Sequence, residues 1–360
     1  MPKEARSEFV DSTYTGKYGQ LRVLGTAFLD GGFIDQLSQK KGDEFVKQLS
    51  AANYSKEIDG LSGLYKGTDL IEAVINAHMM SSMQNVLFAV PSNALPFVNA
   101  YLSRFDIENI KLIISSKKLG YRVEQTEAFL VIGRGVPAGL LGAIITKEDY
   151  KNILEQSDIE GVVKNLVKYG YGVTLMKSMD DVKKDNDISG MILSLDLLYY
   201  DRLIDAYRMH NSPEGQILNY LRDSIDIKNL MSSIKASVMH YKDIKSYFIK
   251  GGSIPESTLS ELAEKDIYEI KDYSPFKIDY AFDLYKKDPF LSYIEVALKK
   301  ELYKKYLGIF RRSGFSLGFL LAFMMRAEIE RDEVRNAWLK NYYGLSDERF
   351  SHMKILDYII

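Results

Sequence analysis

Apolar residues recur at helical spacing along most of this chain. Two segments show the pattern well, with faces made by Leu70, Ile71, Val74, Ile75 and His78 and by Leu195, Leu198, Tyr199, Leu203 and Ile204. Residues three, four and seven positions apart share one side of an α-helix, whereas the alternation typical of a half-buried strand is scarce here. The eight prolines fall mostly near the ends of the repeated segments described below, where they disturb no helix interior. The pattern predicts an all-α protein.

A four-residue motif occurs three times in this helical background. It consists of an acid, then Ile or Val, then any residue, then Asn, and its copies are Asp106-Ile107-Glu108-Asn109, Asp226-Ile227-Lys228-Asn229 and Glu333-Val334-Arg335-Asn336. Composition alone would produce on the order of one match. The asparagines stand at positions 109, 229 and 336, in steps of 120 and 107 residues. Such regular recurrence indicates an internal repeat.

Two further markers keep nearly the same phase. Short helices close on three tyrosines in steps of 117 and 102 residues, namely Tyr54, Tyr171 and Tyr273. The segment 129–137 parallels the segment 247–255 at an offset of 118 residues, and each contains glycines and ends in proline. A weaker version follows the third motif, where we expect Gly344 to end one helix and Ser346 to cap the next.

These markers predict three similar helical-bundle units with boundaries at residues 1–140, 141–255 and 256–360. The first unit includes an N-terminal extension, and the three units are expected to pack around a shared axis or in an arc.

The motif can be placed on a helix. Ile107, Ile110 and Ile114 form an apolar stripe, while Asp106 and Asn109 share a different face. Asn is a poor residue for a helix interior because its side chain competes for backbone hydrogen bonds. We therefore expect each motif Asn to anchor a neighbouring segment, a structural role that folding would require in every unit. The structural residues predicted in this way are Asp106, Asn109, Asp226, Asn229, Glu333 and Asn336.

Composition narrows the class of protein. The chain has 360 residues, of which 46% are apolar and 27% are charged, as in a soluble globular protein. Its 47 basic and 49 acidic residues leave a net charge of -2, which gives no overall field that would favour nucleic acid or anionic lipid. The chain contains no Cys, so thiol chemistry and disulfides are excluded, and a reducing compartment such as the cytoplasm fits.

Neither a secretory signal nor a membrane span is expected. The first six residues lack the charged, apolar and small-residue order of a signal peptide. The longest apolar run, residues 314–325, is shorter than the roughly 20 residues that a membrane-spanning helix needs. We expect this run to form a buried helix.

Motifs for chemistry are weak or missing. The four histidines lack the spacing of four residues that builds a helical metal site, and the glycine-rich residues 133–139 lack the features of a phosphate loop. No catalytic arrangement, cofactor or small-molecule substrate is therefore expected. An enzyme whose site spans the units stays a minor alternative, with Glu295, His210 and His240 as candidates.

One basic stretch is a candidate surface for a partner. It contains Lys299, Lys300, Lys304, Lys305, Arg311 and Arg312, with Tyr303, Tyr306, Phe310 and Phe315 among them. A basic amphipathic helix can meet lipid headgroups, an acidic protein surface or RNA, and RNA fits least because the whole chain is nearly neutral. A solvated helix face with its aromatic residues turned inward is the alternative reading.

The order of several short segments resembles a known family, the C subunits of the archaeal and bacterial A/V-type ATPases, whose eukaryotic counterpart is the d subunit of the vacuolar proton pump. The resemblance covers nearly the whole chain. Its carriers are residues 18–23, Leu49 with Tyr54, residues 104–111, residues 195–200, Leu221-Arg222 leading into residues 226–230, the loop 251–255, and Glu295, Glu328, Glu330 and residues 333–336.

The resemblance implies three similar helical units around a pseudo-threefold axis, shaped as a funnel. It also implies a non-catalytic rotor subunit in the central stalk, peripheral on the cytoplasmic side of the membrane. Such a subunit links the ring of proteolipid subunits to the shaft made by the D and F subunits, and so couples ion translocation to ATP synthesis or hydrolysis. A soluble helical-repeat adaptor that joins protein partners is the main alternative from another class.

Overall fold

The computed structural model describes residues 15–132, 145–210, 214–240, 244, 247–314 and 316–356. The regular structure of these residues is helical, and they contain no strand. The all-α prediction is therefore confirmed. The glycine-rich residues 133–139 and the predicted boundary after residue 140 lie outside the described residues.

Six long helices form the centre of the molecule, in three consecutive pairs. Each has between 21 and 27 residues, which at 1.5 Å per residue makes rods of about 30 to 40 Å. The pairs are α5 (Gly67–Ala89) with α6 (Leu95–Leu119), α12 (Ser189–His210) with α13 (Gly215–Met239), and α17 (Ser292–Arg312) with α18 (Leu317–Tyr343). One pair falls in each of the three predicted units.

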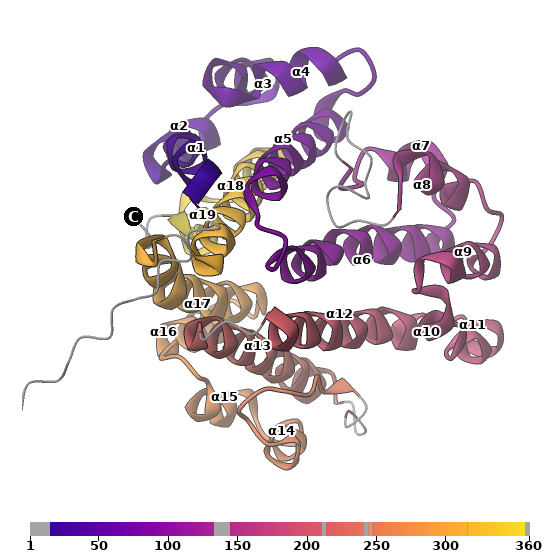
Figure 1. The fold of residues 1–360 in the computed structure, drawn as a ribbon. Coiled ribbons are helices and arrows are strands. Elements are labelled where there is room, and N and C mark those ends of the chain that lie inside the picture. Colours follow the sequence, from indigo (N-terminus) through magenta and orange to yellow (C-terminus); the bar gives the residue numbers. More distant parts are fainter. Residues whose placement is uncertain are drawn as a thin grey trace, which may run out of the picture.

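The long helices follow one another in a closed order (Figure 1). Helix α18 packs along α5 and α17, α17 packs along α13, α13 touches α12, and α12 packs along α6. The short turn between α5 and α6 then leads back to the start. The main contacts between the pairs are thus made by the long helices themselves.

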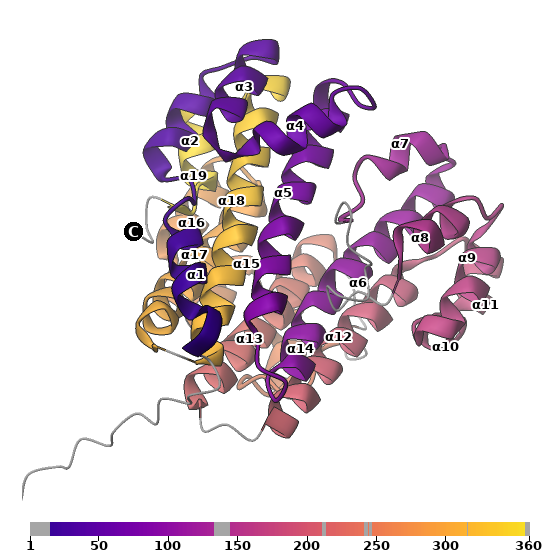
Figure 2. The same ribbon diagram turned by 45° about the horizontal axis from the view of Figure 1, so that its top comes forward.

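Shorter helices cover the outside of this order. The N-terminal group packs against α5 and α18, as Figure 2 shows, and consists of α1 (Thr15–Gly25), α2 (Gly31–Ser38), α3 (Gly42–Leu49), the π-helical turn η2 (Ser50–Tyr54) and α4 (Ser55–Leu61). The group next to α6 and α12 consists of α7 (Val123–Glu127), α8 (Lys147–Leu154), α9 (Ile159–Leu166), η4 (Val167–Tyr169), α10 (Gly172–Met176) and α11 (Met179–Asp185). The C-terminal elements lie on α13 and α17 and are α14 (Glu256–Leu262), α15 (Ile267–Ile270), η6 (Lys271–Tyr273), α16 (Asp279–Lys287) and α19 (Asp347–Met353).

Helix α18 contains most of the apolar run that was predicted to be a buried helix. Its first nine residues are all buried, and the helix packs between α5, α17 and α2. The hydroxyl of Ser316 accepts the backbone N–H of Phe319 at the start, and Gly344 ends the helix with a positive φ of 65°. The hydroxyl of Ser346 caps α19, so both end signals of this region are confirmed. Among the described residues, no helix is long and apolar enough to cross a membrane.

Candidate functional site

The first motif copy holds the segment that follows α7 against α6. The Asn109 side-chain amide donates to the backbone carbonyl of Val131 at 3.1 Å, and its oxygen accepts the N–H of the same residue at 2.7 Å. Asn109 is only 1% exposed. Because a buried peptide group needs partners for both its donor and its acceptor, the amide is well suited to this position. This is the anchoring role that the sequence predicts.

The second copy repeats this contact on α13. Asn229 donates to the carbonyl of Ile249 and accepts its N–H, each at 2.8 Å. One turn earlier, the Asp226 carboxylate accepts the N–H groups of Ser253 and Ile254 at 2.8 and 3.0 Å. A side chain on Gly252 would overlap that carboxylate, which explains why a glycine occupies this loop position.

The third copy is shifted by one helical turn from its predicted place. The sequence predicts Glu333 as the motif acid. In the structure it takes the anchoring position of the Asn, because its carboxylate accepts the N–H of Ile355 at 2.7 Å. The residue spacing of this contact is 22, as it is between Asn109 and Val131. Asn336 is half-buried and makes no side-chain hydrogen bond to the described part of the chain. We correct the third copy accordingly, with Glu333 as the anchor and Glu330 as the acid one turn before it.

Tyrosines from other segments meet the motif acids. Tyr150 and Tyr171 both donate to Asp106, and Tyr54 donates to Glu330 at 2.8 Å. Burial, reinforced by the facing carboxylates, raises the pKa of all three tyrosines, so they remain O–H donors at neutral pH. Two of the three tyrosine markers therefore reach a motif acid of another unit. The third, Tyr273, is exposed.

Ion pairs also join the long helices. Arg104 on α6 pairs with buried Glu328 on α18 at 2.7 Å, and Tyr101 donates to the same carboxylate at 2.9 Å. Arg335 forms a forked pair with Glu72 on α5, at 2.8 and 3.0 Å from its Nε to the two oxygens. Burial raises the pKa of Glu328, and Arg104 opposes that shift. The acids of α18 therefore serve packing between helices.

The basic stretch on α17 is divided between the interior and the surface. Lys300 is buried and donates to the carbonyl of His352, while Lys299 pairs with Asp332 at 2.6 Å. The nearby aromatic residues Tyr303, Tyr306 and Phe310 are all buried. This agrees with the alternative interpretation of the stretch, a solvated helix face with its aromatic residues turned inward.

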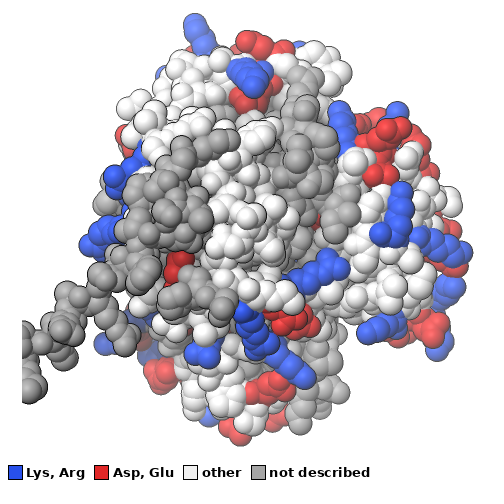
Figure 3. Space-filling model, viewed as in Figure 1, with Lys and Arg blue, Asp and Glu red and all other residues white. Residues whose placement is uncertain are grey.

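The remaining four basic residues are exposed, although Lys305 also pairs with Asp223 at 2.8 Å. Lys304 and Lys305 have side chains 58% and 50% exposed, and Arg311 and Arg312 lie on the surface at the end of the helix. On the face drawn in Figure 3, both signs of charge alternate around the edge and no patch of one sign dominates. The candidate patch is thus smaller than the sequence suggested.

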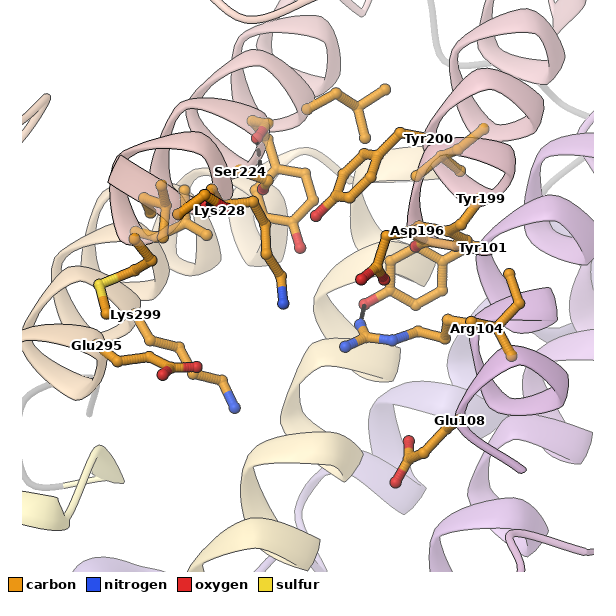
Figure 4. A pocket seen from close by; sticks show the side chains of 18 of the residues that line it. Tyr101, Arg104, Glu108, Asp196, Tyr199, Tyr200, Ser224, Lys228, Glu295 and Lys299 are labelled. Atoms are coloured by element: carbon orange, nitrogen blue, oxygen red, sulfur yellow. Dashed lines mark hydrogen bonds between the residues drawn. The ribbon is translucent and has the colours of Figure 1, made fainter. Parts of the chain in front are cut away.

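A cavity of about 450 Å³ lies between the long helices. Its lining comes from α6, α12, α13 and α17, with charged side chains that include Arg104, Asp196, Lys228 and Lys299. Figure 4 shows these four side chains directed into one common space. Buried tyrosines supply much of the remaining wall, namely Tyr101, Tyr199, Tyr200, Tyr220 and Tyr303.

Sequence reasoning missed this cavity, although a signal was present. The unspecified residue of the motif is Glu108 in the first copy and Lys228 in the second, and both line the cavity. In the corrected third copy the same position is Asp332, the partner of Lys299 at the cavity wall. A residue next to the motif Asn points about 100° away from it on a helix, here toward the centre of the molecule.

The residues suggested for an enzyme do not come together. His210 ends α12 and His240 follows α13, so the 25 residues of α13 separate them by roughly 37 Å. Glu295 lies at the cavity wall, 3.8 Å from Lys235. The described residues hold no group of three or more metal-binding side chains. His210 and His240 therefore do not share one site.

Together, these features define a class of protein, an all-helical protein whose long helices are tied by buried polar contacts around a cavity. The chain belongs to the ATP synthase (C/AC39) subunit family, whose model matches residues 18–352.

Curated relatives agree with this assignment. The chain is 34% identical to the C subunit of the A-type ATP synthase of Thermoplasma volcanium over 354 residues, which cover 96% of this chain and 99% of the relative. Identity to the protein of the same name from Thermoplasma acidophilum is 35%, over 94% of this chain and 97% of the relative. The one from Methanosphaera stadtmanae is 23% identical over 88% and 81%.

Proposed function

We propose that this chain is a non-catalytic rotor subunit in the central stalk of an A/V-type ATP synthase or ATPase. In this role it links the membrane proteolipid ring to the shaft made by the D and F subunits, and so couples ion translocation to ATP synthesis or hydrolysis. The observation that carries the proposal is the match to the C subunits of A-type ATP synthases over almost the full length of both chains.

The fold supports a part that transmits torque. A subunit that transmits torque must be rigid. In this chain, long helices from distant parts of the sequence, such as α5 and α18, pack side by side. Glu328 on α18 ties to α6, and Glu72 on α5 ties to Arg335 on α18, through buried or half-buried pairs. Pairs of this kind resist separation because breaking one leaves a charge in a low-dielectric interior.

The repeat suggests how the part is built. One pair of long helices lies within each proposed unit, at residues 1–140, 141–255 and 256–360, and this supports our proposal that the three units lie about a pseudo-threefold axis as a funnel. Two units share the Asn tie, and the third uses Glu333 at the equivalent place. In this proposal the protein is peripheral on the cytoplasmic side and needs no cofactor, nucleic acid or small-molecule substrate.

The exposed part of the basic stretch is the proposed contact with the membrane sector or the shaft. Lys304 has its side chain more than half exposed, and Lys305 is half exposed while pairing with Asp223 at 2.8 Å. Reversing both charges, in Lys304→Glu with Lys305→Glu, should weaken retention of the protein on the complex. The matched control is Lys286→Glu with Lys287→Glu, an adjacent exposed lysine pair at the end of α16.

The test is a pull-down of the tagged chain from mildly solubilised native membranes, read by quantitative mass spectrometry. We expect catalytic A and B subunits in clear excess over the bait, together with proteolipid, and several-fold less of both with the Lys304 and Lys305 double variant. Thermal melts of the variants check that each is folded. Recovery of the bait alone, or with unrelated soluble partners, contradicts the rotor proposal and favours the adaptor. Full retention of the double variant removes only the basic contact.

A further inference from the structure

We infer that the central cavity is a binding site for a small phosphate-type oxyanion, held by the Lys228 ammonium group and by a set of tyrosine hydroxyls. This inference does not depend on the rotor proposal, because it follows from the side chains that line the cavity. Four observations lead to it.

The first observation is an excess of hydrogen-bond donors. Tyr199, Tyr200, Tyr220 and Tyr303 are each at least 92% buried and line the cavity from α12, α13 and α17. Within the described residues, none of their hydroxyls has a hydrogen-bond partner. Tyr101 and Tyr306, which are also buried, donate to Glu328 and Asp223. The four hydroxyl oxygens are accessible from the cavity, so they can donate to an acceptor that enters it.

The second observation is that these hydroxyls stay protonated. Burial raises the pKa of each of the four tyrosines, and for Tyr199 and Tyr200 the nearby Arg104 only partly opposes that shift. Each therefore offers an O–H donor throughout the neutral range. A ligand rich in acceptor oxygens fits such a wall better than one that donates.

The third observation is an unpaired cation. Three of the other lining cations have close ion-pair partners, which are Glu328 for Arg104, Asp196 for Lys111 and Asp332 for Lys299, at 2.6 to 2.7 Å. Lys235 lies 3.8 Å from Glu295. Lys228 has no ion pair or hydrogen bond to the described part of the chain, and its side chain points into the cavity (Figure 4).

The surroundings of Lys228 favour an incoming anion. Lys228 is exposed to the cavity, and desolvation by the surrounding helices lowers its pKa. No acid of the described residues forms an ion pair with its ammonium group, so an anion that enters the cavity can pair with it. The nearby acids Asp196 and Glu295 do not replace an anion, because Lys111 and Lys235 already face them. An oxyanion beside Lys228 would supply the missing charge and accept from the tyrosines.

The fourth observation is size. The cavity volume of about 450 Å³ is many times the roughly 30 Å³ occupied by one water molecule. It can hold inorganic phosphate with its hydration, or the phosphate group of a larger molecule. Phosphate offers four oxygens in a tetrahedral arrangement, which suits donors that line the cavity from three helices better than a flat carboxylate does.

The test is calorimetric titration of the isolated full chain with inorganic phosphate, at ionic strength held constant with chloride. We expect one saturable site in the wild type. Lys228→Met should bind about tenfold more weakly or worse, because it removes the charged hydrogen-bond donor beside the anion. The double variant Tyr199→Phe with Tyr200→Phe should also lose several-fold in affinity. The matched control is Lys184→Met, an exposed lysine of α11 outside the cavity, which should bind as the wild type does.

The variants are expected to fold. Lys228 is a cation without an ion pair, so Met should be tolerated at its position, and Lys228→Arg offers a second variant that keeps the charge and should retain binding. A wild type without saturable binding overturns the site, and so does Lys228→Met binding as strongly as Lys184→Met. A parallel titration with pyrophosphate separates the two sources of the ligand group. Tighter binding of pyrophosphate supports a larger phosphorylated ligand, and weaker binding supports inorganic phosphate itself.

Discussion

The motif helices α6 and α13 differ from α18 in the chemistry of their anchors. On α6 and α13, an Asn amide satisfies both the N–H and the C=O of one buried residue, Val131 or Ile249. On α18, the Glu333 carboxylate accepts the N–H of Ile355, and a carboxylate cannot donate to a carbonyl. The same helix position therefore carries two different solutions.

The difference reflects what each helix must hold. Each amide bonds a residue that follows it by 20 to 22 positions, within the same proposed unit. Glu330 on α18 accepts from Tyr54 and from the N–H of Leu29, which are 276 and 301 residues away, and lies 3.6 Å from His78. Buried acids on α18 thus join the N-terminal helices to the C-terminal ones. The amides of α6 and α13 make local contacts only, whereas the buried acids of α18 make both a local contact, from Glu333 to Ile355, and contacts between the two ends of the chain.

The largest effect is expected from Glu330→Ala. This change leaves the Leu29 N–H and the Tyr54 hydroxyl without their acceptor. The site is buried, since Glu330 is only 2% exposed. Removing one partner from a buried charged network typically costs about 3 to 5 kcal/mol. Urea unfolding would measure the loss, and hydrogen exchange would show it at Leu29. Glu348→Ala on the surface of α19 is the control, with a change under about 0.5 kcal/mol.

A cost for Glu330→Ala no larger than that of Asn229→Ala would break the comparison. The α18 acids would then contribute no more to the closed order of helices than the local amides do.

An intermediate effect is expected for the amide ties. Asn109→Ala and Asn229→Ala should each destabilise the protein by about 1 to 3 kcal/mol, because a buried peptide group loses both of its partners. Asn336→Ala should be neutral or slightly stabilising, since Asn336 makes no side-chain hydrogen bond among the described residues and Ala is the better helix former. Urea unfolding of the three variants measures these costs.

Asn229→Asp sharpens this test. It keeps the acceptor for the Ile249 N–H but loses the donor to its C=O, and so copies the chemistry of Glu333. We expect a cost between those of the wild type and Asn229→Ala. If Asn336→Ala proves as damaging as Asn109→Ala, the corrected position of the third motif is wrong.

The smallest effect concerns the helix that brings Tyr150 to Asp106. Asp149 lies in the first turn of this helix, α8, and its pKa is lowered to about 2 by the Thr146 hydroxyl and then by Tyr169 and Lys168. Its folded pKa lies below the unfolded value near 3.9, so its contribution is present above about pH 4 and is lost as the pH falls toward 2.

Asp149→Asn should therefore cost at most about 1 kcal/mol at pH 7, because the side chain is 25% exposed and solvent screens its ion pair. The difference from wild type should disappear near pH 2. Unfolding free energies measured between pH 7 and pH 2.5 check this, with the exposed neighbour Glu148→Gln as a control that removes the same charge. A gap that stays constant over this range would show that Asp149 acts through something other than its charge.

Much of the local structure could be predicted from the sequence. The buried faces of α5 and α12, the end signals Gly344 and Ser346, and the roles of Asn109 and Asn229 depend on residues within a turn or two, or on a repeat that is visible by comparison. The third anchor could not be found in this way. Arg331 occupies the position that holds Ile in the first two copies, so the corrected copy no longer matches the pattern.

The sequence by itself determined the helices, their apolar faces and the existence of a repeat, because periodicity and capping are properties of neighbouring residues. The tertiary structure decided which charges are buried and which line the cavity. Lys300 and Lys304 are four residues apart on one helix, yet one is buried beneath His352 and the other is exposed. Lys228 and Tyr199 share a cavity only because α12 and α13 pack with α6 and α17. A site made by four helices depends on distances between segments, and local sequence patterns contain no such distances.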